Sequence, residues 1–419
     1  MRVLLMTWAC DRDDVSEPEI SYKWAREMSQ EHDVTVFAVS KPDRYGAVQE
    51  QFPHLPVIEW SDIRLPDRLS RFQAIVKPGY LHYYIQARRN LRRLLAEQHF
   101  DVIHHVSPLA WRYPSPAAGL GVPLLRGPLE GGLPTPTVLA GAVAETEAGF
   151  MSLRKTDSLR KRWDPVLCAS YRATEKVLGT APYVRELLAP MPINDFAVEL
   201  DNGIDDPLPL TYDAMRPART GRLELLFVGR VIRTKGVRDA VRALARVESR
   251  TPVRLTVIGD GEELEACRRE AGELCLGDRV RFLGWRPKAD VQAHLAAADV
   301  FLFPSFREPT GGVLLEALRH ALPCITCNYG GPAQIVDESC GIRIAPAAEH
   351  RFAGTLAAAI DLLADNSDLR GRLAHGASRR VAENLDWRVK RRRVSRIYEE
   401  MAAVELETRP VLTPALVGA

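Results

Sequence analysis

The sequence predicts an α/β fold of two doubly wound domains that face a central cleft. Short runs of β-branched and other apolar residues alternate with helical stretches along the chain, a pattern typical of parallel sheets. The length of 419 residues is enough for two or three domains with sizeable cores. A proline-rich segment, 205–217, divides the pattern and is typical of an interdomain linker.

The apolar runs give the order of the expected strands. In the first half these are Val3–Met6, Val34–Ala38, Val102–Ile103, Pro123–Leu125, Val177–Thr180 and Ala197–Leu200. In the second half they are Leu225–Val228, Leu255–Ile258, Val280–Phe282, Val300–Phe303 and Cys324–Thr326. A basic amphipathic helix follows. We therefore expect domains at 1–205 and 206–385, a C-terminal helix at 386–405 and a disordered tail at 406–419.

Composition argues against several classes of protein. A net charge of +2 gives no reason to expect a nucleic-acid partner. The seven cysteines are an odd number and scattered, and the apolar run at Met1–Thr7 is too short for a signal sequence, so we expect a reduced, cytoplasmic protein. No window approaches the length of apolar sequence that a transmembrane helix needs.

The segment from Arg307 to Glu316 carries the strongest functional signal. Pro309 directs Glu308 away from helical geometry, and the apolar run from Val313 onwards predicts a buried helix that ends in a second carboxylate, Glu316. The glycines at 311 and 312 fall where the first free amides of that helix point outward, an arrangement suited to a phosphate group. The alternative is a capped core helix with two solvated acids.

Two cations, Arg230 and Lys235, follow the first strand of the second half. Cations fixed near a departing diphosphate stabilise the negative charge that develops in the transition state. Positive charge at the start of a helix is unfavourable in the absence of an anion, which favours a bound anion over two ordinary surface residues.

These motifs and their order resemble the retaining glycosyltransferases of family 4, which have the GT-B fold of two Rossmann-like domains. The resemblance covers about residues 200–400 and rests on Asn202-Gly203-Ile204-Asp205, Phe227-Val228-Gly229-Arg230, Lys235-Gly236, Val257-Ile258-Gly259-Asp260-Gly261, Val280-Arg281-Phe282-Leu283-Gly284, the two-glutamate segment, and Trp387 with its basic helix.

The resemblance implies a donor site in the second domain and an acceptor site in the first. Glu308, Arg230 and Lys235 would be catalytic. The donor-binding residues would be Gly229, Arg230, Lys235, Gly259, Gly261, Leu283, Glu308, Thr310, Gly311, Gly312, Val313 and Glu316. The donor would be a UDP- or GDP-sugar, transferred with retention and without a metal or another cofactor. A bacterial polysaccharide or glycoconjugate pathway is the implied setting.

The first half departs from the family pattern. The loop after the first strand has no glycine, and no histidine follows Pro123–Leu125, where many members place one. The polar, aromatic or flexible residues nearest the expected acceptor side are Trp8, His104, His105, Arg126, Glu130 and Gly131.

Two stretches of the first half, 64–93 and 154–162, are basic and interleaved with apolar residues. Such surfaces dock on anionic lipid, which would suit a lipid-linked saccharide acceptor and a peripheral location at the inner face of the membrane. A solvated face and a small soluble acceptor are the alternatives. The Cys324-x-x-Cys327 spacing lacks a second pair of ligands, so it predicts core cysteines rather than a zinc site.

Two other classes of function stay open at this stage. A GT-B nucleotide-sugar epimerase or glycoside phosphorylase would need no separate acceptor, or would need free phosphate. A non-catalytic nucleotide-sugar-binding subunit would bind without turnover. A hydride-transfer enzyme is disfavoured because Gly259-Asp260-Gly261 lacks the third glycine of a dinucleotide fingerprint.

Overall fold

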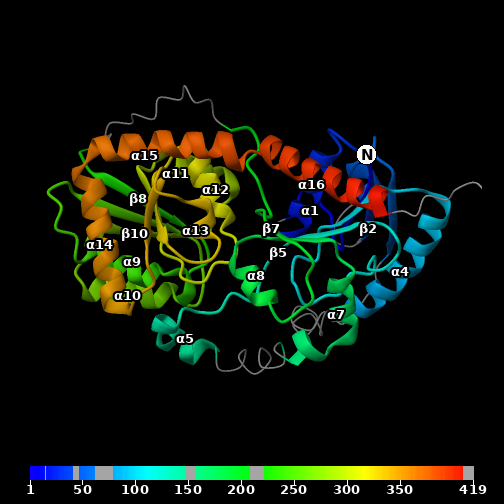
Figure 1. Ribbon diagram of the computed structural model, residues 1–419. Helices are drawn as coiled ribbons and strands as arrows, with labels where there is room; N and C mark the ends of the chain where they lie inside the picture. The colour runs from blue at the N-terminus through cyan, green and yellow to red at the C-terminus, as the bar shows by residue number, and fades with distance from the viewer. Residues whose placement is uncertain are drawn as a thin grey trace, which may run out of the picture.

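The computed structural model describes residues 1–14, 16–40, 47–61, 79–147, 157, 159–207 and 221–408. It shows two parallel sheets in two lobes, with helices on both faces of each (Figure 1). The α/β prediction of two doubly wound domains is confirmed.

The first sheet has seven parallel strands in the order β3-β2-β1-β4-β5-β6-β7. The strands are β1 Arg2–Met6, β2 Asp33–Ser40, β3 Val57–Ser61, β4 Val102–His105, β5 Leu124–Leu129, β6 Lys176–Gly179 and β7 Phe196–Val198. The apolar run of β1 pairs with β2 on one side and β4 on the other, and four of its residues are fully buried. A strand covered on both faces needs such a continuous run.

The second sheet has six parallel strands in the order β10-β9-β8-β11-β12-β13. These are β8 Leu223–Val228, β9 Val253–Ile258, β10 Val280–Gly284, β11 Val300–Phe303, β12 Cys324–Cys327 and β13 Gly341–Ile344. Its chain order reverses between β8 and β11. Open α/β sheets bind ligands outside the carboxyl ends of their strands at such a reversal.

Helices cover both sheets. Those of the first lobe are α1 Glu17–Met28, α2 Val48–Gln51, α4 Gly79–Glu97, α7 Pro165–Arg172 and α8 Tyr183–Leu188. Those of the second are α9 Val237–Leu244, α10 Leu264–Glu273, α11 Lys288–Ala297, α12 Gly312–Arg319, α13 Pro332–Ile335, α14 Glu349–Asp365 and α15 Ser367–Arg380. A π-helical turn, η5 (Val381–Leu385), leads into the last helix.

Besides the 205 region, two segments of the described residues pass between the lobes (Figure 1). Residues 131–147, here called the crossing segment, leave the first sheet and form η2 (Thr137–Leu139) and α5 (Ala140–Glu147), and Leu139 and Val143 pack in the core of the second lobe. The division expected at residue 205 does not include this crossing, because its apolar residues do not reveal which core they join. In the other direction, α16 (Trp387–Thr408) returns to pack on α1.

The return of α16 is fixed by a buried ion network. Lys390 is fully buried, and its Nζ donates to Glu199 Oε1 at 2.7 Å and to the Leu200 carbonyl at 2.6 Å. Arg393 donates to both oxygens of Glu199. Burial alone would raise the pKa of Glu199, but Lys390 and Arg393 lower it below its ordinary value.

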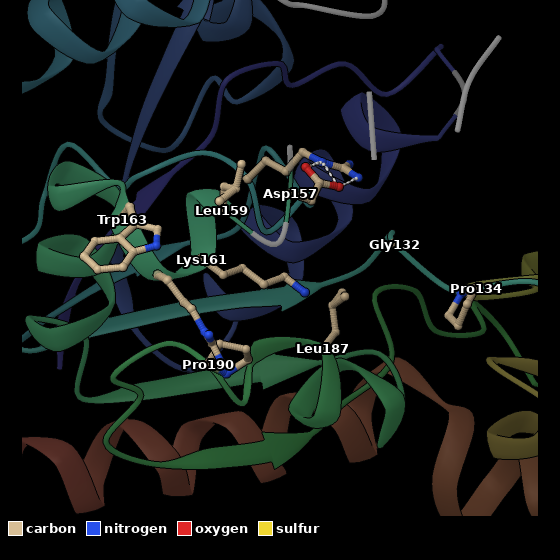
Figure 2. Close-up of a pocket in the computed structure, with 10 residues that line it drawn as sticks. Gly132, Pro134, Asp157, Leu159, Lys161, Trp163, Leu187 and Pro190 are labelled. Atoms are coloured by element: carbon tan, nitrogen blue, oxygen red, sulfur yellow. Dashed lines mark hydrogen bonds and ion pairs between the residues drawn. The ribbon is translucent and has the colours of Figure 1, made fainter. Parts of the chain in front are cut away.

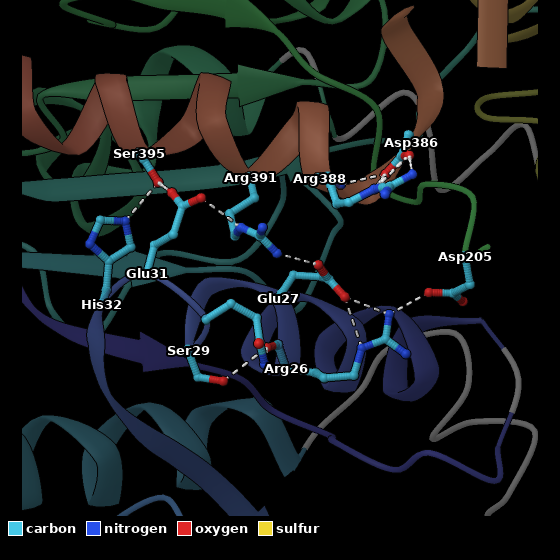
Figure 3. A network of polar contacts seen from close by, with 11 residues as sticks. Arg26, Glu27, Ser29, Glu31, His32, Asp205, Asp386, Arg388, Arg391 and Ser395 are labelled. Atoms are coloured by element: carbon cyan, nitrogen blue, oxygen red, sulfur yellow. Dashed lines mark hydrogen bonds and ion pairs between the residues drawn. The ribbon is translucent and has the colours of Figure 1, made fainter. Parts of the chain in front are cut away.

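A more exposed polar network joins α1, the 205 region and α16 (Figure 3). Arg391 bonds to Glu27 and Glu31 of the first lobe, while Arg26 contacts Asp205. The contacts tie both ends of the second domain to the same helix of the first.

The structure adds two strands to those expected. Both β3 and β13 lie at sheet edges, and neither has a long apolar run. The C-terminal helix continues to Thr408, past the expected end at 405, and residues 409–419 of the predicted tail lie outside the described residues. Most of the predicted linker, 208–217, also lies outside them.

Candidate functional site

The loops after β8 and β9 approach each other so closely that only backbone fits between them. Gly229 N donates to the Ile258 carbonyl at 3.0 Å, and Val231 N donates to the Asp260 carbonyl at 2.8 Å. A Cβ built on Gly259, whose φ is +139°, would lie 1.8 Å from the Gly229 carbonyl oxygen. Both loops therefore present backbone and the exposed Arg230 at the carboxyl edge of the sheet.

The short helix η3, Arg233–Lys235, places two cations in different surroundings. Arg233 is buried and donates to both carboxylate oxygens of Asp239, at 2.6 and 3.2 Å, so its charge is matched inside the fold. Lys235 projects the other way and contacts the Glu308 carboxylate. The side chains of Lys235 and Glu308 retain 13% and 12% of their accessible surface, so this pair faces a nearly enclosed space.

Several hydrogen bonds hold the Glu308 loop in place. Ser305 Oγ and Phe306 N both bond to the Thr234 carbonyl of η3, each at 3.1 Å. The Glu308 carbonyl accepts a bond from Gly331 N at 2.9 Å. These contacts join loops that follow three neighbouring strands, so the backbone that carries Glu308 is held by all three.

Helix α12 begins immediately after this loop. Gly311 is its N-cap, Gly312 is exposed, and Val313 and Thr310 are half-buried beside them. The first-turn amides thus open next to Glu308, where the helix dipole favours negative charge.

Glu316 lies one turn further along α12. It accepts a hydrogen bond from Gln292 Nε2 of α11 at 2.6 Å, and Gln292 Oε1 is 2.9 Å from His320 Nε2. Burial raises the pKa of Glu316, against the opposing influence of Lys288, Gln292 and Lys23. Because Lys23 belongs to α1, Glu316 faces the first domain as well as its own.

The structure thus brings together, at one edge of the second sheet, most of the predicted donor-site residues. Leu283 lies in β10 on the far side of β9, half-buried and packed against the core of the second lobe. The roles assigned to these residues stay predictions.

The histidines predicted on the acceptor side are inside the first domain. His104 is fully buried, with Nδ1 2.6 Å from Tyr398 Oη and Nε2 2.8 Å from the Gly127 carbonyl. His105 is 3% exposed and bonds to Ser115 Oγ at 2.9 Å. Burial lowers the pKa of His104 to about 4 and that of His105 to about 3.

Trp8 and Arg126 are also held by packing. Trp8 lies within 5.5 Å of Tyr80 and 5.9 Å of Tyr83, measured between ring centroids. Arg126 is 1% exposed, contacts the Tyr113 carbonyl and lies 4.4 Å from the centroid of the Tyr171 ring. His104, His105 and Arg126 are therefore buried inside the first domain, and Trp8 is partly buried and packs against its core.

Glu130 and Gly131, by contrast, stand where the chain leaves the first sheet. Glu130 N bonds to the Leu109 carbonyl at 2.8 Å, and Gly131 has φ +84° with open space around its Cα. The crossing segment then reaches the donor-side loops: the Pro134 carbonyl accepts from Tyr329 Oη at 3.1 Å, and Arg307 Nη1 donates to Thr135 Oγ1 at 3.0 Å. Glu130 and Gly131 therefore lie beside the segment that contacts the loops around Glu308.

Sequence reasoning missed several residues of this region. Gln292 and Lys288 lie on a helix whose pattern gives no functional signal, and Thr135 reaches Arg307 only because the crossing segment passes between the domains. Asp201 was likewise missed. Burial raises its pKa to about 6, with Lys390 acting to lower it and Glu308 to raise it. The negative charge of Glu308 thus raises the pKa of Asp201, which lies at the junction between the domains.

Within the described ranges, no group of three or more His, Cys, Asp or Glu side chains is placed to hold a metal ion. Cys324 and Cys327 are both fully buried in β12. No described helix is long and apolar enough to cross a membrane.

Comparisons with known proteins show that the part of the chain that includes this edge of the sheet is similar to a recognised family. Residues 212–380 match the model of the family Glycosyl transferases group 1. The matched region includes Arg230, Lys235, Glu308 and Glu316. A glycogen synthase of Mycobacterium tuberculosis is 34% identical over 211 residues, which cover 50% of this chain and 49% of that protein. The lipopolysaccharide core biosynthesis glycosyltransferase LpsE of Rhizobium meliloti is 32% identical over 180 residues, covering 43% and 49%.

The chain thus spans about half the length of the curated relatives it matches. Among solved structures, Anabaena Alr3699/HepE in complex with UDP is similar over 96% of this chain and 100% of that chain, with a TM-score of 0.60 and 17% identity. Sucrose-phosphate synthase from Thermosynechococcus elongatus has a TM-score of 0.62 and 20% identity over 96% and 99%. At these identities the likeness shows the fold, and the fold is GT-B.

Proposed function

We propose that this protein is a glycosyltransferase that moves a sugar from a nucleoside diphosphate sugar to a hydroxyl acceptor, in polysaccharide, glycolipid or other glycoconjugate biosynthesis. One observation carries the proposal. Lys235 and Glu308, from loops after different strands, meet at the carboxyl edge of the second sheet beside the open start of α12. The match of residues 212–380 to the glycosyltransferase family model supports it.

In this proposal, the diphosphate binds to Lys235, Arg230 and the first-turn amides of α12. A diphosphate on Lys235 would compete with Glu308 for the ammonium, so donor binding would release the carboxylate towards the sugar. As the glycosidic bond to the diphosphate breaks, negative charge grows on the leaving oxygen. Fixed cations at that position lower the barrier without a metal ion.

Glu316 is placed to accept hydrogen bonds from ribose hydroxyls, since Gln292 orients it and it is half-buried. Glu308 would contact the transferred sugar and stabilise the positive charge that develops on its anomeric carbon. We further propose transfer with retention, in which the leaving phosphate accepts the proton of the acceptor hydroxyl on the same face. The buried, neutral His104 and His105 have no part in that proton transfer.

UDP is the first donor nucleotide to test, because the similar HepE was solved with UDP. The LpsE relative acts in lipopolysaccharide core biosynthesis, which supports a saccharide acceptor that is lipid-linked; a small soluble acceptor is the second option. A peripheral site at the inner membrane face is part of the proposal. On α4, Leu81 and Ile85 are exposed and are followed by the exposed cations Arg89, Arg92 and Arg93.

The test is product analysis with UDP-glucose, UDP-galactose and GDP-mannose, each incubated with and without saccharide acceptors. The proposal expects a new glycoside only when acceptor is present, and NMR should show the donor's anomeric configuration retained. A changed sugar without acceptor would instead mean an epimerase. Product formed only with free phosphate would mean a phosphorylase, and nucleotide binding with no turnover would mean a binding subunit.

A further inference from the structure

The first domain contains a pocket beside the crossing segment. Its volume is about 460 Å³, and its wall runs from Gly132 and Pro134 to residues just before α7 (Figure 2). Pro134 is hydrogen-bonded to Tyr329, whose neighbouring loop carries the Gly331 amide bound to Glu308. The pocket therefore lies on the acceptor side, and its Pro134 end is linked through Tyr329 and Gly331 to the loop that carries Glu308.

The charge in this pocket is unbalanced. Arg112 is neutralised by Asp157, to which it donates at 2.9 and 2.5 Å. Lys161 and Arg162 also line the pocket, and no carboxylate of the described residues lies within ion-pair distance of either. Figure 2 shows the Lys161 ammonium pointing towards Leu187, into the middle of the pocket.

Lys161 is half-buried, so its charge is costly. Its Nζ lies 4.9 Å from the centroid of the Trp111 ring, and burial lowers its pKa, with Asp157 opposing and Arg112 adding to that effect. An anion bound here would offset the free-energy cost of removing water from the ammonium.

A second polar group without a partner lies behind the pocket wall, at Gly132. Trp111 is fully buried, and its Nε1–H has no hydrogen-bond partner among the described residues. The atom lies directly behind Gly132, only 3.1 Å from where a Cβ on that glycine would stand. A buried donor without an acceptor is uncommon in folded proteins.

The remaining wall is apolar and open to solvent. Leu159 retains 61% of its accessible surface and Trp163 retains 76%. Trp163 lies at the opposite end of the pocket from Gly132 and Pro134 (Figure 2). The pocket thus has cations near its middle and a large apolar flank at its outer end.

We propose that this pocket binds the phosphate group of the acceptor, with Lys161 and Arg162 contacting the phosphate oxygens and Leu159 and Trp163 contacting an apolar chain attached to it. The inference rests on the proposed transferase function and specifies its acceptor as a phosphate-bearing amphiphile. The saccharide end would extend along Gly132 and Pro134 towards Glu308.

The test uses the full chain and calorimetric titration with octyl phosphate below its micelle concentration, glucose 1-phosphate and octyl glucoside. Octyl phosphate should bind at one site, glucose 1-phosphate more weakly, and octyl glucoside not measurably. Lys161→Met should weaken octyl phosphate binding at least tenfold, and Trp163→Ala should weaken it while leaving glucose 1-phosphate unchanged. Arg268→Gln, at an exposed ion pair on α10, is the matched control and should bind like the wild type.

Equal binding of octyl phosphate to the wild type and to Lys161→Met, or no binding to either, would overturn the proposal. Glucose 1-phosphate binding as tightly as octyl phosphate would reject the apolar part and assign the phosphate to a soluble sugar. UDP is titrated in parallel. If UDP binds and octyl phosphate does not, only the pocket assignment fails; if no nucleoside diphosphate binds, the proposed function itself fails.

Discussion

The two domains have the same doubly wound architecture but use the carboxyl edges of their sheets in opposite ways. In the second domain, charged groups gather at that edge: Arg230 is exposed, and Lys235 is in direct contact with the Glu308 carboxylate. In the first domain, two of the residues predicted on the acceptor side, His104 of β4 and Arg126 of β5, are buried.

The difference teaches that a position on a fold does not by itself make a ligand site. His104 is covered by α16, whose Tyr398 hydrogen-bonds to it, and Arg126 contacts the Tyr113 carbonyl in the loop after β4. In the proposed function, acceptor recognition lies further out, at Glu130, the crossing segment and the pocket around Lys161. Variants that separate effects on turnover from effects on stability test this difference between the two domains.

The largest effect on turnover is expected at the open edge. Lys235→Ala should lower kcat by a factor of 10² to 10³, about 3–4 kcal/mol of barrier, because it removes a cation from the leaving diphosphate. Its thermal unfolding should change little. Steady-state kinetics with Arg268→Gln as a control measure this, and full activity in Lys235→Ala would place the diphosphate elsewhere.

The next largest effect is expected at the buried His104 of the first domain, where a substitution should lower the free energy of unfolding. His104→Ala leaves Tyr398 Oη and the Gly127 carbonyl without their partner, which should cost about 1–3 kcal/mol of unfolding free energy. Activity per folded molecule should stay within about threefold. Chemical denaturation is the measurement, and His99→Ala, at an exposed histidine, is the control. A large loss of kcat in folded protein would instead make His104 catalytic.

The buried histidines also predict a pH dependence. Because the pKa values of His104 and His105 are lowered to about 4 and 3, the unfolded chain takes up protons below about pH 6.5 that the folded chain does not. Stability should therefore fall as the pH falls from 7 to 5, by up to about 1.4 kcal/mol per pH unit for each histidine.

Asp201 acts in the opposite direction, because its raised pKa means that the folded chain takes up its proton first. Comparing the wild type with His105→Gln at pH 7 and pH 5 cancels that contribution. The variant should show a smaller loss of unfolding free energy. An identical slope would mean that His105 is protonated in the folded protein.

The smallest effect is expected at the surface network between the domains. Arg26→Gln removes a contact with Asp205, but both side chains are more than a third exposed, so solvent screens the pair. The loss of stability should be below about 1 kcal/mol. A shift of several degrees in Tm would show that this network, rather than the buried Lys390 network, fixes the domains.

The sequence predicts the sheets, and it singles out the Glu308 segment, for a physical reason. Strands such as β1 and β11 are buried on both faces and read as continuous apolar runs, and the Glu308 segment combines a proline, glycines and a helix start within a few residues. Edge strands such as β3 and β13 carry no such signal. The crossing segment could not be predicted, because its apolar residues give no indication of which core they join.

The same reasoning explains why the acceptor side was harder to predict. His104 and Arg126 have side chains of the kinds that bind ligands or transfer protons. Whether they face a cleft depends on their contacts with α16 and with the loop after β4, which the local sequence does not reveal. The pocket around Lys161 is assembled from residues near 112, 132, 161 and 187, so no local motif marks it.

The most direct test is calorimetric titration of the wild type, Lys235→Ala, Arg230→Ala and His104→Ala with UDP, GDP and ADP. The account predicts one-site binding of one nucleoside diphosphate by the wild type, weakened at least tenfold in both cation variants and unchanged in His104→Ala. Binding that survives in both cation variants, or no binding of any of the three nucleotides, would contradict it.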